Sequence, residues 1–231
     1  MQSVTLVNGT DLVNWANRRD AQSVLPQLLR RLIHATVAAV QRSSFPAGEA
    51  VQLSGWDGKL VVEHGNAFVP DSASVWEMSV ERKVGNKADE DYAKRSRELH
   101  GPDNQQTTFI FVTPRRWPGK DEWINARRAE NIWRDVRVYD ADALEEWLEL
   151  APVVHLWFSV LLGKRAQGAV DLETFWADWS ATTKPAIPPE LLLAGREETA
   201  KSVQDWLREP TTPLLSLKAE SRDEAVSVFA A

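Results

Sequence analysis

Apolar residues near the start of the chain recur every three or four positions, as they do on one face of an α-helix. This spacing, which includes Leu28, Leu29 and Leu32, predicts helix over 11–41 with Asp11 capping its first turn. Pro26 stands either near a helix start or at a break between two helices, because proline lacks a backbone N–H. The next segment along the chain, RSSFPAGEA, predicts a loop.

From residue 50 to residue 80 the pattern changes to short runs rich in valine and tryptophan, bounded by turn residues, and predicts three strands. Beyond it, helical and strand patterns alternate. The predicted elements are strands in AVQLSGWDG, KLVVEHG and SVWEMSV, helix 87–99, strand 107–114, helix 121–133, strand 136–140 and helices 141–150 and 151–163. Alternation after an antiparallel start predicts an α/β fold with a mixed central sheet and helices on both faces.

A connector separates this first domain, 1–165, from the rest of the chain. The linker, 166–189, carries one short tryptophan-bearing helix and ends in the proline-rich stretch TTKPAIPP. The second unit, 190–231, predicts a helix over 196–209, a strand over 214–219 and a helix that starts at Ser221, with Glu224 at the capping-box position. One strand and part of a helix cannot close a core, so we expect a truncated second α/β unit cut from a longer protein.

Composition narrows the class of protein. No cysteine occurs among the 231 residues, which excludes disulfides and thiolate metal sites and makes a reducing cytoplasm the simplest compartment. The chain shows neither a signal-peptide pattern nor an apolar run long enough for a membrane span. A net charge of −6 is unlike that of a uniformly basic nucleic-acid binder, although DNA contact can be confined to one face. Most of the 11 tryptophans are expected in the core.

Two carboxylates are candidates for chemistry. Asp57 stands in GWDG at a turn between strands, and Glu77 lies among bulky apolar neighbours on a predicted strand. A buried carboxylate is costly unless a metal, a cation or hydrogen bonds compensate it, and two on adjacent strands would suit Mg²⁺. Taken singly, each has a plainer interpretation: Asp57 as a turn residue and Glu77 as a residue on the solvent face.

The helix after the third strand places Lys87, Asp91 and Arg95 on one face, spaced i, i+4 and i+8. Such a face could bring a lysine to a phosphate. A solvated, salt-bridged helix explains the same spacing. The strand that ends in VTPRRW puts Arg115 and Arg116 at the end of the sheet, where they are either phosphate contacts or surface arginines flanking a core tryptophan.

The order of these segments, GWDG, VPDSASVWEMS, NKADEDYAKR, TTFIFVTPRRW and VRVYDADALEEWL, resembles the PD-(D/E)xK nuclease superfamily over roughly 10–163. In particular it resembles the Mrr-type nuclease domains at the N-terminus of large bacterial antiphage defence proteins. The resemblance implies a restriction-endonuclease-like fold in which Asp57 and Glu77 hold Mg²⁺ or Mn²⁺. The motif lysine is replaced by Ser79, so Lys87 is the candidate for a displaced lysine and Lys83 the second candidate.

The resemblance therefore implies a metal-dependent DNA endonuclease, with Asp57, Glu77 and Lys87 catalytic and with Arg95, Arg115 and Arg116 contacting DNA. Its implied partners are DNA, a C-terminal sensor or NTPase-like region of the same polypeptide, and further copies in a homo-oligomer, in the cytoplasm and without a membrane. Two alternatives belong to other classes. One is a catalytically inactive nuclease fold that binds DNA or a partner. The other is an oligomerisation module built on the tryptophan-rich helices from Trp147 to Trp179.

Overall fold

The computed structural model describes residues 6–46, 55–97, 103–164, 172–209 and 214–231. Contacts divide the chain into two compact units, Met1–Ala166 and Gln167–Ala231. Each unit is described by itself.

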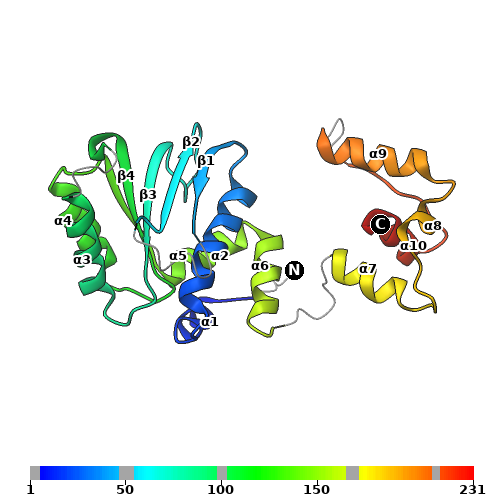
Figure 1. Cartoon of the computed structure of the whole chain (residues 1–231), viewed down its shortest axis with the longest axis horizontal. Coiled ribbons are helices and arrows are strands. Elements are labelled where there is room, and N and C mark those ends of the chain that lie inside the picture. Colours follow the sequence, from blue (N-terminus) through cyan, green and yellow to red (C-terminus); the bar gives the residue numbers. More distant parts are fainter. Residues whose placement is uncertain (1–5, 47–54, 98–102, 165–171, 210–213) are drawn as a thin grey trace. The chain divides into compact units, whose positions relative to one another are not determined.

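The first unit is built on a five-stranded sheet with the strands in chain order (Figure 1). The strands are β1 (Val40–Ser44), β2 (Gly58–Val62), β3 (Ser72–Met78), β4 (Thr107–Val112) and β5 (Asp135–Tyr139). The pairs β1–β2 and β2–β3 are antiparallel, whereas β3–β4 and β4–β5 are parallel. The expected mixed sheet of an α/β fold is therefore confirmed.

Helices cover both faces of this sheet (Figure 1). They are α1 (Gly9–Trp15), α2 (Ala21–Thr36), α3 (Val84–Ser96), α4 (Lys120–Ala129), α5 (Ala141–Glu149) and α6 (Pro152–Leu161). On one face, α1, α2, α5 and α6 enclose the larger core, which we call the α2 face. On the other face, α3 and α4 enclose a smaller core, which we call the α3 face.

Strand β3 shows how the sequence assigns side chains to these faces. Successive residues of a strand point to opposite sides. Trp76 and Met78 accordingly lie in the core of the α2 face, while Val75 lies in the core of the α3 face. Glu77 therefore points to the α3 face as well. The parallel neighbour β4 is buried along its whole length, in agreement with its continuous apolar and β-branched sequence.

The prediction of one helical region over 11–41, followed by a loop, was wrong in detail. The region forms two helices, because the chain leaves helical geometry after α1 and resumes it at Ala21. Asn8 caps α1, with Asp11 as the reciprocal partner of the capping box. Strand β1 lies where the end of that helix and the loop were expected. Its five residues are partly or fully exposed, so no apolar alternation marks it in the sequence.

The other elements of the first unit agree more closely with expectation. Helix α3 begins at Val84, three residues before its predicted start. The predicted strand 50–58 falls largely outside the described residues, and 55–57 form no strand. Six tryptophans of the described chain are buried, which confirms that most of them belong to the core: Trp15, Trp56, Trp76, Trp123, Trp133 and Trp147.

The described part of the second unit consists of helices and irregular segments. Its helices are α7 (Leu172–Ser180), α8 (Pro189–Leu193), α9 (Glu197–Arg208) and α10 (Arg222–Ala230). The segment 214–219, where a strand was predicted, forms no regular secondary structure and pairs with no described strand. Helix α7, expected in the linker, packs on α10 and so belongs to this unit. The predicted cap of α10 is confirmed: the Ser221 side chain accepts from the Glu224 backbone N–H at 3.1 Å.

Candidate functional site

Glu77 lies near the carboxyl end of β3 and is only 4% exposed. It is paired in parallel register with Phe111 of β4, and its face of the sheet is otherwise lined by apolar residues such as Val75 and Phe109. The solvent-face interpretation of Glu77 is therefore wrong. A carboxylate at such a position requires a compensating partner.

Asp57 directly precedes β2. Gly58 pairs with Trp76 in antiparallel register, so the preceding residue, Asp57, stands opposite the residue after Trp76, which is Glu77. Directly opposed residues of antiparallel strands share one face. The Asp57 carboxylate also accepts a hydrogen bond from the backbone N–H of Met78 at 2.8 Å. Glycine is required at Gly58, because a Cβ there would overlap the ring of Phe45 on the α2 face.

Asp57 is close enough to Glu77 to affect the ionisation of the buried carboxylate. Burial first, and then the charge of Asp57, raise the pKa of Glu77 to about 8, against the lowering effect of Arg95. Burial also raises the pKa of Asp57, and the Met78 N–H offsets this only in part. Both shifts mean that a negative charge in this place is poorly solvated, which is the electrostatic condition that favours binding of a cation.

Helix α3 lies over these carboxylates and contributes three charged side chains at i, i+4 and i+8. The Lys87 ammonium donates to Asp91 at 2.6 Å, and the Arg95 Nε donates to Glu77 at 2.5 Å. Asp91 and Arg95 are buried, whereas Lys87 is partly exposed. The face is therefore salt-bridged, as the plainer interpretation expected, but Asp91 and Arg95 are buried and not solvated.

Lys87 belongs electrostatically to the same cluster. Burial acts to lower its pKa, but the hydrogen bond to Asp91 and the charges of Asp91, Glu81 and Glu77 outweigh burial, so its pKa is raised above the usual value. The ammonium therefore remains charged at neutral pH. The structure brings Asp57, Glu77 and Lys87 together and adds Asp91 and Arg95 to them.

Arg95 does not lie where a DNA-contacting residue would have to lie. Its side chain is 5% exposed, and besides Glu77 it contacts the Gly55 carbonyl and the Trp56 ring, with Cζ 4.5 Å from the ring centroid. The expectation that Arg95 contacts DNA is corrected accordingly, because a buried guanidinium held by these groups cannot reach a phosphate outside. The periodicity of α3 indicated which face of the helix carries Arg95, but it did not indicate that this side chain is buried.

Arg115 and Arg116 follow β4 and make different contacts. The Arg115 guanidinium donates to the carbonyls of Val80 and Ala16, at 2.6 and 3.0 Å, and so ties the end of α1 to the segment after β3. It remains partly exposed. Arg116 is exposed and forms an ion pair with Asp142 at 2.9 Å. Contact of either arginine with DNA stays a prediction.

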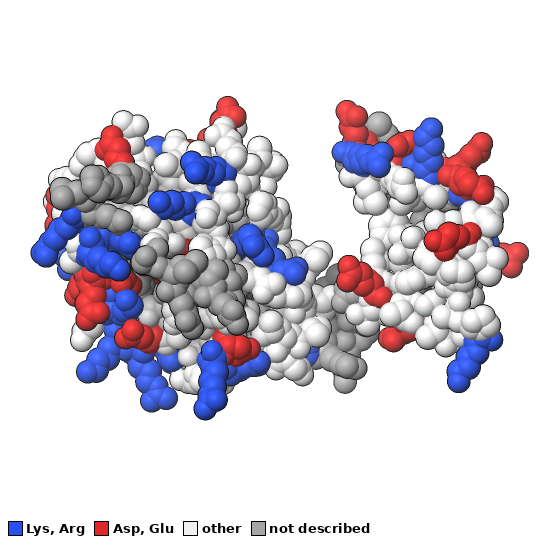
Figure 2. Space-filling model, in the orientation of Figure 1, with Lys and Arg blue, Asp and Glu red and all other residues white. Residues whose placement is uncertain are grey.

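Ser79, in the place of the motif lysine, is buried, and its hydroxyl accepts from the backbone N–H of Glu81 at 3.1 Å. Lys83 is exposed at the start of α3. Figure 2 shows lysine and arginine side chains projecting along the lower edge of the first unit, beside acidic ones. Basic and acidic side chains are mixed along this edge, in agreement with the acidic total charge.

The donor set fits a divalent cation held by two carboxylates. Within the described residues, no three His, Cys, Asp or Glu side chains form a group suited to a metal. Mg²⁺ does not need one, because it usually retains several waters and binds one or two carboxylates together with substrate phosphates. Asp57 and Glu77 offer hard oxygen ligands on one face, while one Glu77 oxygen already accepts from Arg95.

Sequence analysis missed the roles of Asp91 and Arg95 as the buried partners of Lys87 and Glu77. The available signal was their spacing together with Tyr92, an aromatic residue that places part of this helix against the core. The sequence contained no signal for the contact of Arg95 with the loop before Asp57, because those residues are about forty positions apart.

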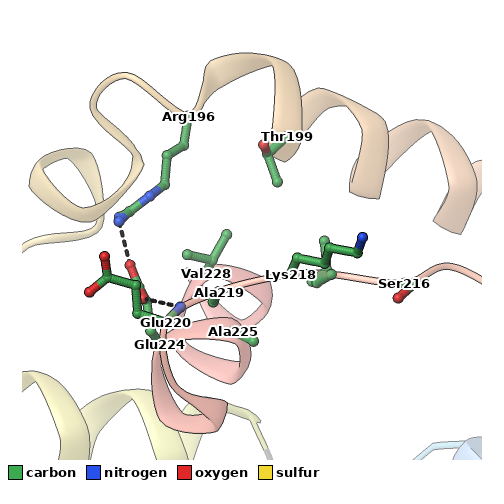
Figure 3. Close-up of a pocket in the computed structure, with 10 residues that line it drawn as sticks. Arg196, Thr199, Ser216, Lys218, Ala219, Glu220, Glu224, Ala225 and Val228 are labelled. Atoms are coloured by element: carbon green, nitrogen blue, oxygen red, sulfur yellow. Dashed lines mark hydrogen bonds and ion pairs between the residues drawn. The ribbon is translucent and has the colours of Figure 1, made fainter.

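A separate pocket of about 550 Å³ lies in the second unit, between the start of α9, the segment 216–220 and α10 (Figure 3). Arg196 and Glu224 form an ion pair at 2.5 Å on its wall. The lining combines this pair with two further charged residues, Lys218 and Glu220, and with small and aliphatic side chains, and none of the sequence-predicted site residues belongs to it.

Comparison with known proteins finds no family model, no curated protein and no solved structure that matches this chain. In the part of the chain that the structure describes, no helix has the length and apolar character needed to cross a membrane.

Proposed function

We propose that the first unit is a Mg²⁺- or Mn²⁺-dependent DNA endonuclease domain. The observation that carries this proposal is the buried carboxylate of Glu77 opposite the partly exposed carboxylate of Asp57, whose charge raises the pKa of Glu77, with the Lys87 ammonium in the same cluster. Burying Glu77 beside a second carboxylate costs stability, and the cost has a functional explanation if a cation and a phosphate bind there.

Each residue has a distinct task in this proposal. Asp57 and Glu77 would hold the cation, and the Met78 N–H restrains the Asp57 carboxylate. When bound, Mg²⁺ would polarise the phosphate and lower the pKa of a water molecule. Lys87, in the N-terminal part of α3, would neutralise charge on the scissile phosphate.

Asp91 positions this lysine. Its carboxylate is buried and accepts from the Lys87 ammonium, which restricts a flexible side chain to one region of the site. Such restriction lowers the entropy cost of aligning a charged group with the reacting phosphate. Lys87 thereby supplies the positive charge that Ser79 is too short and uncharged to supply.

The defence setting rests on the resemblance alone. The proposal there is that this domain is the effector module of a bacterial antiphage protein, controlled by a C-terminal sensor or NTPase-like region and acting as a homo-oligomer in the cytoplasm. Val153 and Val160 of α6 are exposed apolar side chains that an oligomer interface could cover. Trp147, which the tryptophan-rich alternative included, cannot belong to such a surface, because it is fully buried.

A second candidate is an inactive nuclease fold that binds DNA. The Arg95–Glu77 ion pair favours it, because the guanidinium already neutralises one of the two metal ligands. Replacement of the motif lysine by Ser79 favours it as well.

The deciding experiment is cleavage of supercoiled plasmid DNA by the full chain in Mg²⁺ or Mn²⁺, with EDTA as the metal-free control. Asp57→Asn should lower the nicking rate by about 10²–10³-fold, the range for loss of one preorganised electrostatic group. Asp121→Asn is the matched control, since Asp121 is exposed on α4. DNA binding without cleavage in either metal would support the second candidate instead.

A further inference from the structure

Arg95 connects the two elements that carry the candidate metal ligands. Its Nε donates to Glu77 on β3 at 2.5 Å, and its Nη2 donates to the carbonyl of Gly55, two residues before Asp57. The guanidinium also lies over the Trp56 ring. Gly55 has a φ of 152°, a backbone conformation that residues with a Cβ rarely adopt, so the loop is shaped specifically where the arginine meets it.

The charged cluster, as far as the described residues show it, consists of Asp57, Glu77, Lys87, Asp91 and Arg95. Lys87 is paired with Asp91, and Arg95 with Glu77. The hydrogen bond described for the Asp57 carboxylate comes from an uncharged donor, the Met78 N–H. With all five groups ionised, the cluster has one negative charge more than it has positive charges. Arg95 therefore supplies at Glu77 the positive charge that a metal ion would otherwise supply.

A divalent cation bound between Asp57 and Glu77 would meet this guanidinium at close range. One Glu77 oxygen already accepts from Nε, and like charges repel strongly where water is excluded. The contacts with Gly55 and Trp56 do not compete in this way, since neither group is a candidate ligand. Of these contacts of Arg95, the one with Glu77 is the one that conflicts with an incoming cation.

We propose that Arg95 is a positioning residue that acts as an internal counter-cation. It holds Glu77 and the loop before Asp57 in place in the metal-free protein. When Mg²⁺ or Mn²⁺ binds, it releases Glu77 while remaining on Gly55 and Trp56. This inference rests on the proposed function of the site as a metal centre, and it adds that Arg95 opposes metal binding while it maintains the geometry of the ligands.

The first test is calorimetric titration of the full chain with Mn²⁺ and with Mg²⁺ at pH 8.5. Arg95→Gln should bind each metal at least about tenfold more tightly than the wild type, because the competing charge is removed. Its metal-free form should denature at a lower temperature, because Glu77 loses its buried partner. Arg97→Gln, an exposed arginine beside the same helix, should change neither quantity. Equal or weaker metal affinity of Arg95→Gln would overturn the inference.

A second measurement uses the wild type, in case Arg95→Gln does not fold. The Nε–H resonance of Arg95 in a proton–nitrogen spectrum should shift on addition of Mg²⁺, and Asp57→Asn should abolish this shift. An unshifted resonance in a protein that has bound metal would show that the ion pair persists and would overturn the inference alone. If neither the wild type nor Arg95→Gln binds either metal, the inference and the proposed function are both wrong.

Discussion

The two faces of the central sheet differ in how they use buried positions. The α2 face packs aromatic and aliphatic side chains, with Trp147 stacked on Phe68 at a centroid distance of 5.1 Å. The α3 face is apolar along most of its length but carries Glu77, Asp91 and Arg95 near the carboxyl end of β3. The α2 face therefore stabilises the fold by apolar packing, while part of the α3 face carries a charged cluster in place of apolar side chains. That local departure from core packing is the strongest structural reason to regard the cluster as functional.

The largest effect should come from the apolar face. Trp147→Ala should lower the free energy of unfolding by about 3–5 kcal/mol, because it leaves a cavity beside Phe68 and Trp76 and removes the Trp147 hydrogen bond to Thr36. Urea denaturation followed by circular dichroism measures this. Leu150→Ala is the control: Leu150 is 63% exposed, and its loss should change stability by less than about 0.5 kcal/mol. Equal effects of the two variants would contradict the description of this face as the main core.

Lys87→Ala tests the charged face through function. It should lower the rate of DNA cleavage by about a hundredfold, the effect typical of one preorganised cation, with a smaller effect on DNA affinity. Some loss of stability is also expected, because Asp91 is buried and loses its partner. Lys83→Ala, at an exposed position just before α3, should be much milder. Cleavage at the normal rate by Lys87→Ala would move the role to Lys83.

The smallest effect concerns stability and pH. Burial raises the pKa of folded Glu77 to about 8 from its ordinary value of 4.5. Between these two pH values the folded protein binds more protons at Glu77 than the unfolded chain does, so this group lowers stability as pH rises. We expect Glu77→Gln to remove part of that fall, on the order of 2 kcal/mol, in unfolding experiments from pH 5 to pH 8.

The matched control for this pH experiment is Glu63→Gln, because Glu63 is exposed. It should leave the pH dependence of stability unchanged. A pH dependence that is identical in Glu77→Gln and in the wild type would mean that Glu77 titrates as an ordinary surface carboxylate, and the two faces would then differ less than described.

The sequence by itself determined the class of the fold and most of its elements. The apolar run of β4, the spacing in α5 and the cap of α10 are local signals, and each depends on residues a few positions apart. Local patterns also identified Asp57, Glu77 and Lys87 as candidates. Local patterns failed at two places. Strand β1 forms although its residues are exposed and show no apolar alternation. The apolar run 214–219 forms no strand.

Only the tertiary structure decided how deeply the charges are buried and which of them meet. In the sequence Arg95 is one more cation on a polar helix, yet it lies against Glu77, eighteen positions earlier, and Gly55, forty positions earlier. Pairings of this kind depend on the register of β2 with β3 and on how α3 packs over the sheet. Both are set by the sum of many weak contacts across the α3 face and not by any short stretch of residues.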